Sequence, residues 1–184
     1  MENELPDDVA LHLEEMVNTS SDKWAGEENA LARLKDIWRE KNRLFEEQIQ
    51  VLGMSFLETV EPDDPRGMIL TTYSGSLVAL GPGNPRHFEY ASIKLRSDVP
   101  DILKGDEVQL LETLRVGGAA RFSGSPVKKT SAIYRIASVS EKLERDEQEK
   151  RIREAMVFLT NSFVYLNRNL AVSDADVPGQ FDKK

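Results

Sequence analysis

Cysteine is absent from the 184-residue chain, and its absence removes several kinds of site at once. A chain without cysteine has no disulfide, no thiolate zinc site and no cysteine nucleophile. A domain of this length buries about two-thirds of the surface that its unfolded chain exposes, so a hydrophobic core can stabilise it without cross-links. We therefore expect one domain suited to a reducing compartment, and we predict a cytoplasmic location.

Long hydrophobic runs are missing as well. No stretch reaches the roughly eighteen consecutive apolar residues of a membrane-spanning helix. The first sixteen residues contain six acidic residues and no Lys or Arg, whereas a signal peptide starts with basic residues and continues with an apolar run. We therefore expect neither a membrane span nor a signal peptide. The net charge of −8 disfavours nucleic acid and anionic membranes as partners, because both attract positively charged surfaces.

Hydrophobic residues at helical spacing predict three helices, over residues 8–17, 22–52 and 140–170. The apolar residues of the second helix form two rows with a spacing of seven, Trp24, Leu31, Trp38, Phe45 and Leu52 in one and Ala30, Ile37, Leu44 and Val51 in the other. Such a wide apolar surface is typical of a helix that lies broadside on a sheet or between two neighbours. Residues 1–7 and 171–184 are expected to fray.

Between residues 54 and 139 the pattern changes to short runs rich in β-branched and aromatic residues, separated by Gly, Pro and Asp. These runs predict about seven strands, near residues 54–60, 67–73, 76–80, 87–95, 107–114, 119–123 and 131–139. The short links between them predict an antiparallel meander, and residues 97–105 are expected to form one helical turn. We therefore predict an α+β fold over residues 8–170, in which a long N-terminal and a long C-terminal helix flank a curled antiparallel sheet or a small β-barrel.

The C-terminal helix has more apolar surface than one neighbour can cover. Its main seam alternates by four and three residues and consists of Ile152, Met156, Leu159, Phe163, Leu166 and Leu170. Phe158 and Tyr165 lie on one side of this seam, and Val157 and Val164 lie on the other. A helix that is apolar nearly all round is buried on more than one side, so it either crosses the middle of a monomeric core or meets a second copy of the chain.

The second possibility leads to the main functional hypothesis. We expect a non-catalytic protein-interaction module, adaptor or chaperone-like, that forms a homodimer and also binds an unidentified protein partner. The predicted self-association surface consists of Phe158, Phe163, Tyr165, Leu166 and Leu170.

Three resemblances accompany this hypothesis. The order of long helix, β meander and long helix resembles that of prefoldin-type chaperone subunits. Residues 97–110 resemble a barrel segment that follows a coiled coil in proteasomal ATPases, although no ATPase module follows here. Small, acidic, dimeric α+β secretion chaperones are also similar. No residue role is carried over from these proteins, and the chain is assigned to none of the families.

A nucleic-acid-binding role is the first alternative. Bases and aromatic side chains gather in the β region, at Arg86, Phe88, Tyr90, Lys94, Arg121, Lys128 and Lys129. Small barrels hold single-stranded nucleic acid with this combination of side chains. The competing interpretation is that the aromatic residues belong to the core, and the acidic net charge favours it.

An enzyme of unknown class is the second alternative, with His87 and carboxylates from distant parts of the chain. An acidic cleft around His87 would support it. No cofactor or metal site is expected, because the two histidines lack further ligands at suitable spacing. The glycine-rich residues 81–85 precede a strand and lack the Gly-Lys-Ser/Thr ending of a phosphate-binding loop.

Overall fold

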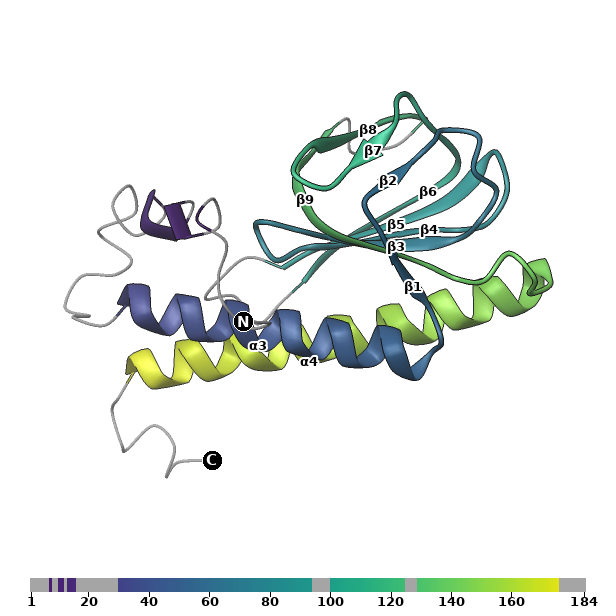
Figure 1. Ribbon diagram of the computed structural model, residues 1–184. Helices are drawn as coiled ribbons and strands as arrows, with labels where there is room; N and C mark the ends of the chain where they lie inside the picture. The colour runs from purple at the N-terminus through teal and green to yellow at the C-terminus, as the bar shows by residue number, and fades with distance from the viewer. Residues whose placement is uncertain are drawn as a thin grey trace.

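The computed structural model describes residues 7, 10, 11, 13–15, 30–93, 100–124 and 129–175, without the side chains of residues 30 and 168–175. It has the predicted α+β fold. A closed, six-stranded antiparallel barrel lies on one face of a pair of long helices, as Figure 1 shows. No helix in the described part of the chain is long and apolar enough to span a bilayer.

The two long helices are α3 (Ala30–Val51) and α4 (Arg145–Ala175), and they run antiparallel to each other (Figure 1). Helix α4 begins five residues later than predicted. The preceding residues form a turn in which Ser140 accepts hydrogen bonds from the backbone N–H groups of Lys142 and Leu143. Asp146 and Glu147 then occupy the first helical turn, where the helix dipole favours acidic side chains. The described positions of the first predicted helix, residues 10, 11 and 13–15, are helical, and residues 22–29 of the second lie outside the described part.

The β region contains nine strands among the described residues. They are β1 (Ser55–Leu57), β2 (Thr59–Val60), β3 (Met68–Thr72), β4 (Leu77–Leu80), β5 (Arg86–Ser92), β6 (Asp101–Leu110), β7 (Leu114–Arg115), β8 (Ala119–Ser123) and β9 (Lys129–Ser138).

Barrel closure depends on the two longest strands, β6 and β9. The barrel order is β9–β3–β4–β5–β6–β8, and β8 pairs with β9 again. Strand β6 pairs with β5 over most of its length and with β8 at Gln109 and Leu110. Strand β9 pairs with β3 along one edge, and along the other edge with β8 and then with β1. Closure leaves few unpaired strand edges, which would otherwise invite aggregation. Strands β2 and β7 form a separate two-stranded ribbon.

The helical turn predicted for residues 97–105 is wrong for residues 101–105. These residues form the first half of β6, where Asp101 pairs with Ser92 and Gly105 with Phe88. Helix-capping signals are local, and here they are outweighed by the hydrogen bonds that a neighbouring long strand offers. Residues 97–99 lie outside the described part of the chain.

Two hydrophobic cores lie on opposite sides of the barrel wall. Alternate residues of β3 and β4 point into the barrel, as Met68 and Leu70 do, and pack with residues from the other strands. The residues between them, such as Ile69, point outward and pack against both helices. Phe45 of α3 and Phe163 of α4 belong to this second core. The barrel wall is therefore apolar on both faces, and the helix pair covers its outer face.

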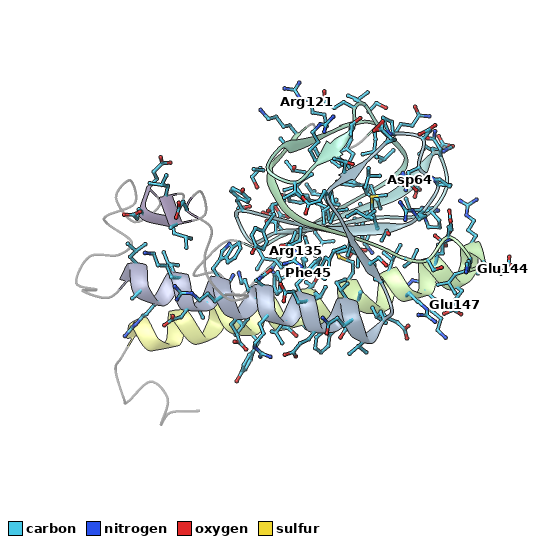
Figure 2. All side chains as sticks on the ribbon, in the orientation of Figure 1. Phe45, Asp64, Arg121, Arg135, Glu144 and Glu147 are labelled. Carbon is cyan, nitrogen blue, oxygen red and sulfur yellow. The ribbon has the colours of Figure 1, made fainter. Side chains whose placement is uncertain are left out.

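Polar contacts hold α3 against the barrel. Trp38 donates a hydrogen bond from its indole N–H to the Tyr73 carbonyl at 3.1 Å, and its ring meets the Tyr134 ring edge-on at 4.4 Å. Glu46 forms an ion pair with Arg135 of β9 at 2.5 Å, and Arg135 lies between α3 and the barrel in Figure 2. These contacts fix which face of α3 meets the barrel.

Lys41 is buried in the same region although it is basic. Lys41 is 2 % exposed, and its Nζ atom has no hydrogen-bond partner among the described residues. This Nζ lies 5.4 Å from the centroid of the Phe163 ring. Burial lowers the pKa of Lys41 from its ordinary 10.5 to about 7, because the charged form loses its hydration.

We predict that Lys41 makes the stability of the protein depend on pH between about 7 and 10. In this range the unfolded chain holds the Lys41 proton and the folded chain releases it, so the free energy of unfolding rises with pH, by up to about 4 kcal/mol in total. Lys41→Met should raise the stability at pH 7 and flatten this rise. Urea denaturation of both proteins at several pH values measures it. Parallel pH profiles of the two proteins would contradict the prediction.

We also predict that a side chain at Gly67, which precedes β3, destabilises the contact between α4 and the barrel. A Cβ atom at this position would lie 2.2 Å from Cδ1 of Ile152 in α4. Gly67→Ala should therefore lower the free energy of unfolding by about 1–3 kcal/mol, because it overpacks the contact between α4 and the barrel. Gly118→Ala is the control, since its Cβ atom would make only an ordinary contact at 3.5 Å with a backbone oxygen.

The double variant Gly67→Ala/Ile152→Val tests the cause of this effect. Ile152→Val removes the clashing Cδ1 atom, so the double variant should lose less stability than the sum of the two single variants. Simple additivity would show that the clash is not the cause.

Candidate functional site

The face of the helix pair that points away from the barrel is covered by no described element (Figure 1). Side chains of both helices project from this face, as Figure 2 shows. Three large apolar side chains of α4 are exposed: Val157 is 59 %, Phe158 44 % and Tyr165 60 % exposed. Phe158 and Tyr165 are seven residues apart, so they lie on the same side of the helix two turns from each other.

These residues line a groove of about 850 Å³ between α3 and α4, here called the outer groove. Its lining consists of Glu40 and Leu44 from α3 and Arg153, Glu154, Val157, Phe158, Asn161, Ser162, Tyr165 and Leu166 from α4. Arg153 and Glu154 are the charged residues that α4 contributes, Glu40 is the one from α3, and residues 155–167 of α4 contain no charged side chain. A contiguous apolar surface of this kind is typical of an interaction site.

On the α3 side of the groove, the charge of Glu40 is neutralised by an ion pair within the helix. Arg43 donates hydrogen bonds to the carboxylates of Glu40 and Glu47 on its own helix. The hydrogen bond from Arg43 holds the pKa of Glu40 below its usual value. The guanidinium and the two carboxylates satisfy one another, so a partner in the groove would mainly meet apolar side chains.

The structure separates the five residues of the predicted self-association surface. Phe158 and Tyr165 are exposed in the outer groove, as a contact surface requires. Phe163 is 1 % exposed and belongs to the core between the helices and the barrel, so its placement on an external surface is wrong. Leu166 is 9 % exposed and lines the outer groove with most of its side chain buried. The side chain of Leu170 lies outside the described part.

The sequence prediction left out two apolar residues of the outer groove. Val157 flanks the seam of α4, and Leu44 belongs to the second apolar row of α3. Both positions were visible in the helical periodicity. Both residues lie beside the main apolar row of their helix. This position is the signal that would have selected them for the surface, because the main row packs in the core.

The residues of the predicted nucleic-acid surface are not brought together on the outside of the barrel. Phe88 is buried inside the barrel, where its ring packs against those of Phe122 and Tyr90 with centroid distances of 5.2 and 6.4 Å. Strand alternation does place Phe88 and Tyr90 on the same face, but this face is the interior. The aromatic platform on which bases would stack is therefore absent from the described outer surface.

The basic residues of that predicted surface are also dispersed. Arg121 lies at the far end of the barrel from the helices and is 3.6 Å from Glu112 (Figure 2). Lys129 is exposed at the start of β9, whereas Lys94 and Lys128 lie outside the described residues. Arg86 is buried, and a buried guanidinium cannot bind a phosphate group at the surface.

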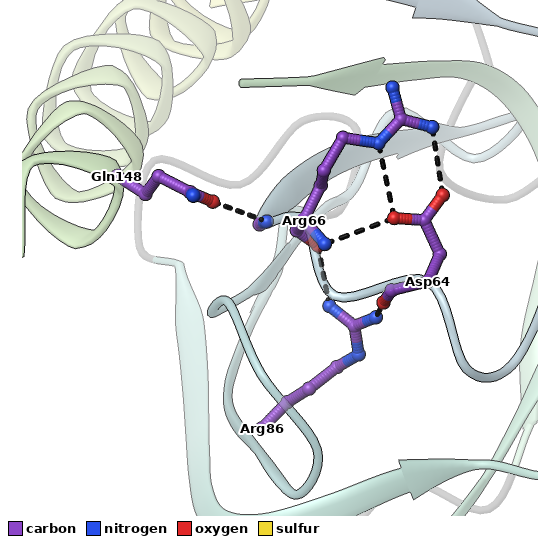
Figure 3. A network of polar contacts seen from close by, with 5 residues as sticks. Asp64, Arg66, Arg86 and Gln148 are labelled. Atoms are coloured by element: carbon purple, nitrogen blue, oxygen red, sulfur yellow. Dashed lines mark hydrogen bonds and ion pairs between the residues drawn. The ribbon is translucent and has the colours of Figure 1, made fainter. Parts of the chain in front are cut away.

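Arg86 instead holds together the loops at one end of the barrel, as Figure 3 shows. Its guanidinium donates hydrogen bonds to the backbone carbonyls of Arg66 at 2.6 Å, Gly81 at 3.0 Å and Asp64. Burial lowers the pKa of Arg86, and the nearby Asp64 carboxylate opposes this shift. The Asp64 carboxylate is bound by Arg66 at 2.8 Å, which keeps the pKa of Asp64 below its usual value.

The same loop is tied to α4. Gln148 accepts a hydrogen bond from the Gly67 N–H at 3.0 Å and donates one to the Leu143 carbonyl at 3.0 Å. The network of Figure 3 therefore connects the barrel to the start of α4, and it uses the guanidinium of Arg86 to bind three backbone carbonyls. We interpret Arg86 as a structural residue.

His87 lies on the outer side of the barrel and pairs with Asp106 of β6, with 2.8 Å between Nδ1 and Oδ1. The sequence analysis missed this pair, because 19 residues separate its members. A pocket of about 290 Å³ adjoins it, and its rim carries charges of both signs rather than an acidic cleft. No Ser, Thr or Tyr lines this pocket, and no three described His, Asp or Glu residues are placed to hold a metal ion.

The geometry thus offers an apolar groove as the leading candidate and a charged pocket as a second one. Comparison of the chain with protein-family models, with curated proteins and with solved structures found no match.

Proposed function

We propose that the chain is a non-catalytic protein-interaction module, adaptor or chaperone-like, that self-associates through α4 at the outer groove. The observation that carries the proposal is the exposure of Val157, Phe158 and Tyr165 along one groove. Each such side chain contributes roughly 1.5–3 kcal/mol when it is fully buried, so covering all three favours association.

Self-complementarity supports a second copy of the chain as the occupant. When two copies of α4 cross antiparallel about a two-fold axis, Phe158 of one copy can meet Tyr165 of the other, and the reverse contact forms at the same time. Asn161 and Ser162 then lie at the axis, where their short side chains let the two helices approach closely.

The absence of charge from the centre of α4 is compatible with the same occupant. Two copies with a net charge of −8 each repel one another, so a stable contact needs an uncharged surface. A two-fold contact also brings each residue near its own equivalent, so a charged residue near the axis would meet a like charge. Residues 155–167 are uncharged, and they are the part of α4 that would lie nearest the axis.

An adaptor or chaperone-like role requires a further protein partner. A pull-down with the dimer as bait, followed by mass spectrometry, would identify this partner. The same pull-down with a monomeric variant shows whether the partner depends on self-association.

We predict that the protein sediments as a dimer and that Phe158→Glu/Tyr165→Glu makes it a monomer. The two carboxylates would lose their hydration in the contact without gaining a partner, which disfavours association strongly. Analytical ultracentrifugation measures the mass, and circular dichroism checks that the variant is folded.

Leu111→Glu is the matched control for this experiment. Leu111 is also an apolar residue with 60 % exposure, but it lies between β6 and β7, away from the outer groove. The control should remain a dimer. A monomeric wild type, or a dimer that survives in the double variant, would overturn the proposal.

A further inference from the structure

A second site lies between α4 and the outer wall of the barrel. The pocket of about 290 Å³ next to His87 has an apolar floor made by Ala79, Ile152 and Met156. Its rim carries His87, Lys104, Asp106 and Arg153, which come from β5, β6 and α4. We propose that this pocket binds a small organic anion, whose carboxylate or phosphate group contacts Lys104, Arg153 and His87 and whose apolar part rests on the floor.

An irregularity of the sheet builds the His87–Asp106 pair. Arg86 pairs with Val108 while Phe88 pairs with Gly105, so β6 has two residues, Asp106 and Glu107, opposite the single His87. Such a bulge re-aims side chains and is frequent next to functional sites. Here it turns the Asp106 carboxylate toward the imidazole.

The bulge has an energetic cost. Glu107 has φ = +57°, a left-handed conformation that is unfavourable for a residue with a Cβ atom. A glycine at this position would avoid the cost. The strain therefore accompanies the placement of Asp106 and His87, which is consistent with a site.

The ion pairs around the pocket favour an anion as the ligand. Asp106 is already bound to His87, and Glu149 is bound to Arg145 at 3.2 Å. Lys104 and Arg153 form no ion pair with a described residue. Glu89, which lies opposite Lys104 in the β5–β6 ladder, is the one remaining acidic residue of the lining.

The hydrogen-bonding capacity of His87 agrees with this ligand. Its Nδ1 atom is occupied by Asp106, which fixes the orientation of the ring. The Nε2 atom forms no hydrogen bond with a described residue, so this side of the ring is available to a ligand. The side chain is 63 % exposed, so a ligand can reach it from solvent.

Butyrate and inorganic phosphate are suitable probes, with chloride as the control for ionic strength. Butyrate combines a carboxylate with a short apolar chain, whereas phosphate has no apolar part. The chain contains only two histidines, so the Cε1 proton of His87 can be assigned in a proton NMR spectrum with the variant His87→Gln. We expect a saturable shift of this resonance with butyrate, a weaker one with phosphate and none with chloride.

The variant Lys104→Ala/Arg153→Ala should weaken butyrate binding by about tenfold or more, since it removes both unpaired cations. Lys142→Ala/Lys150→Ala is the matched control, because it removes the same charge from exposed positions outside the pocket and should bind as the wild type does. Lys104→Gln alone, on a surface strand, repeats the test without a change in α4.

Three results would overturn the proposal. The first is a shift of the His87 resonance that does not saturate. The second is an equal loss of binding in both double variants. The third is an effect of phosphate and chloride equal to that of butyrate. The pocket is formed by residues of a single chain, so a monomeric protein that binds butyrate would leave this inference standing while the proposed function fails.

Discussion

Strands β3 and β4 are buried on both faces, and this constraint determines where the other elements lie. Every described residue of the two strands is buried, so each face needs its own apolar covering. Closure of the barrel covers the inner face, and the pair of α3 and α4 covers the outer one. Since one side of α4 is committed to this contact, its other sides become the outer groove and the wall of the pocket beside His87.

Arg86 and Lys41, the two buried basic residues in the described part of the chain, accommodate a buried charge in different ways. Arg86 keeps its charge because three backbone carbonyls accept its hydrogen bonds and Asp64 lies near. Lys41 has no such acceptor in the described part of the chain, so burial acts on it alone and favours the neutral amine. The first residue organises loops, whereas the second makes the contact between α3 and α4 sensitive to protonation.

Local patterns were sufficient to predict the helices and most strands. The seam of α4 and the rows of α3 follow a helical period over long stretches, and β8 was placed within the bounds that the structure gives it. Pairing between distant segments was beyond such patterns. The first half of β6 looked like a helical turn until β5 supplied a neighbour, and the His87–Asp106 pair depends on a bulge that has no local signature.

The sequence also did not predict whether an apolar face points into the core or toward the solvent. Alternation grouped Phe88 with Tyr90, and helical spacing grouped Phe163 with Leu166, but neither pattern tells inside from outside. Only the covering elements decide this. The exposed pair Phe158 and Tyr165 differs from the seam in one respect, since no element of the described part of the chain covers it.

Arg153 borders both the outer groove and the pocket beside His87. One guanidinium cannot make its strongest contacts with an anion on one side of α4 and with a protein surface on the other side at the same time. Where an anion and a second copy both bind as proposed, occupancy of either side changes the affinity of the opposite side, and thermodynamic reciprocity makes the factor the same in both directions. A single side chain at the ridge of a helix would in that case link the binding of a small anion to the balance between free and assembled chains.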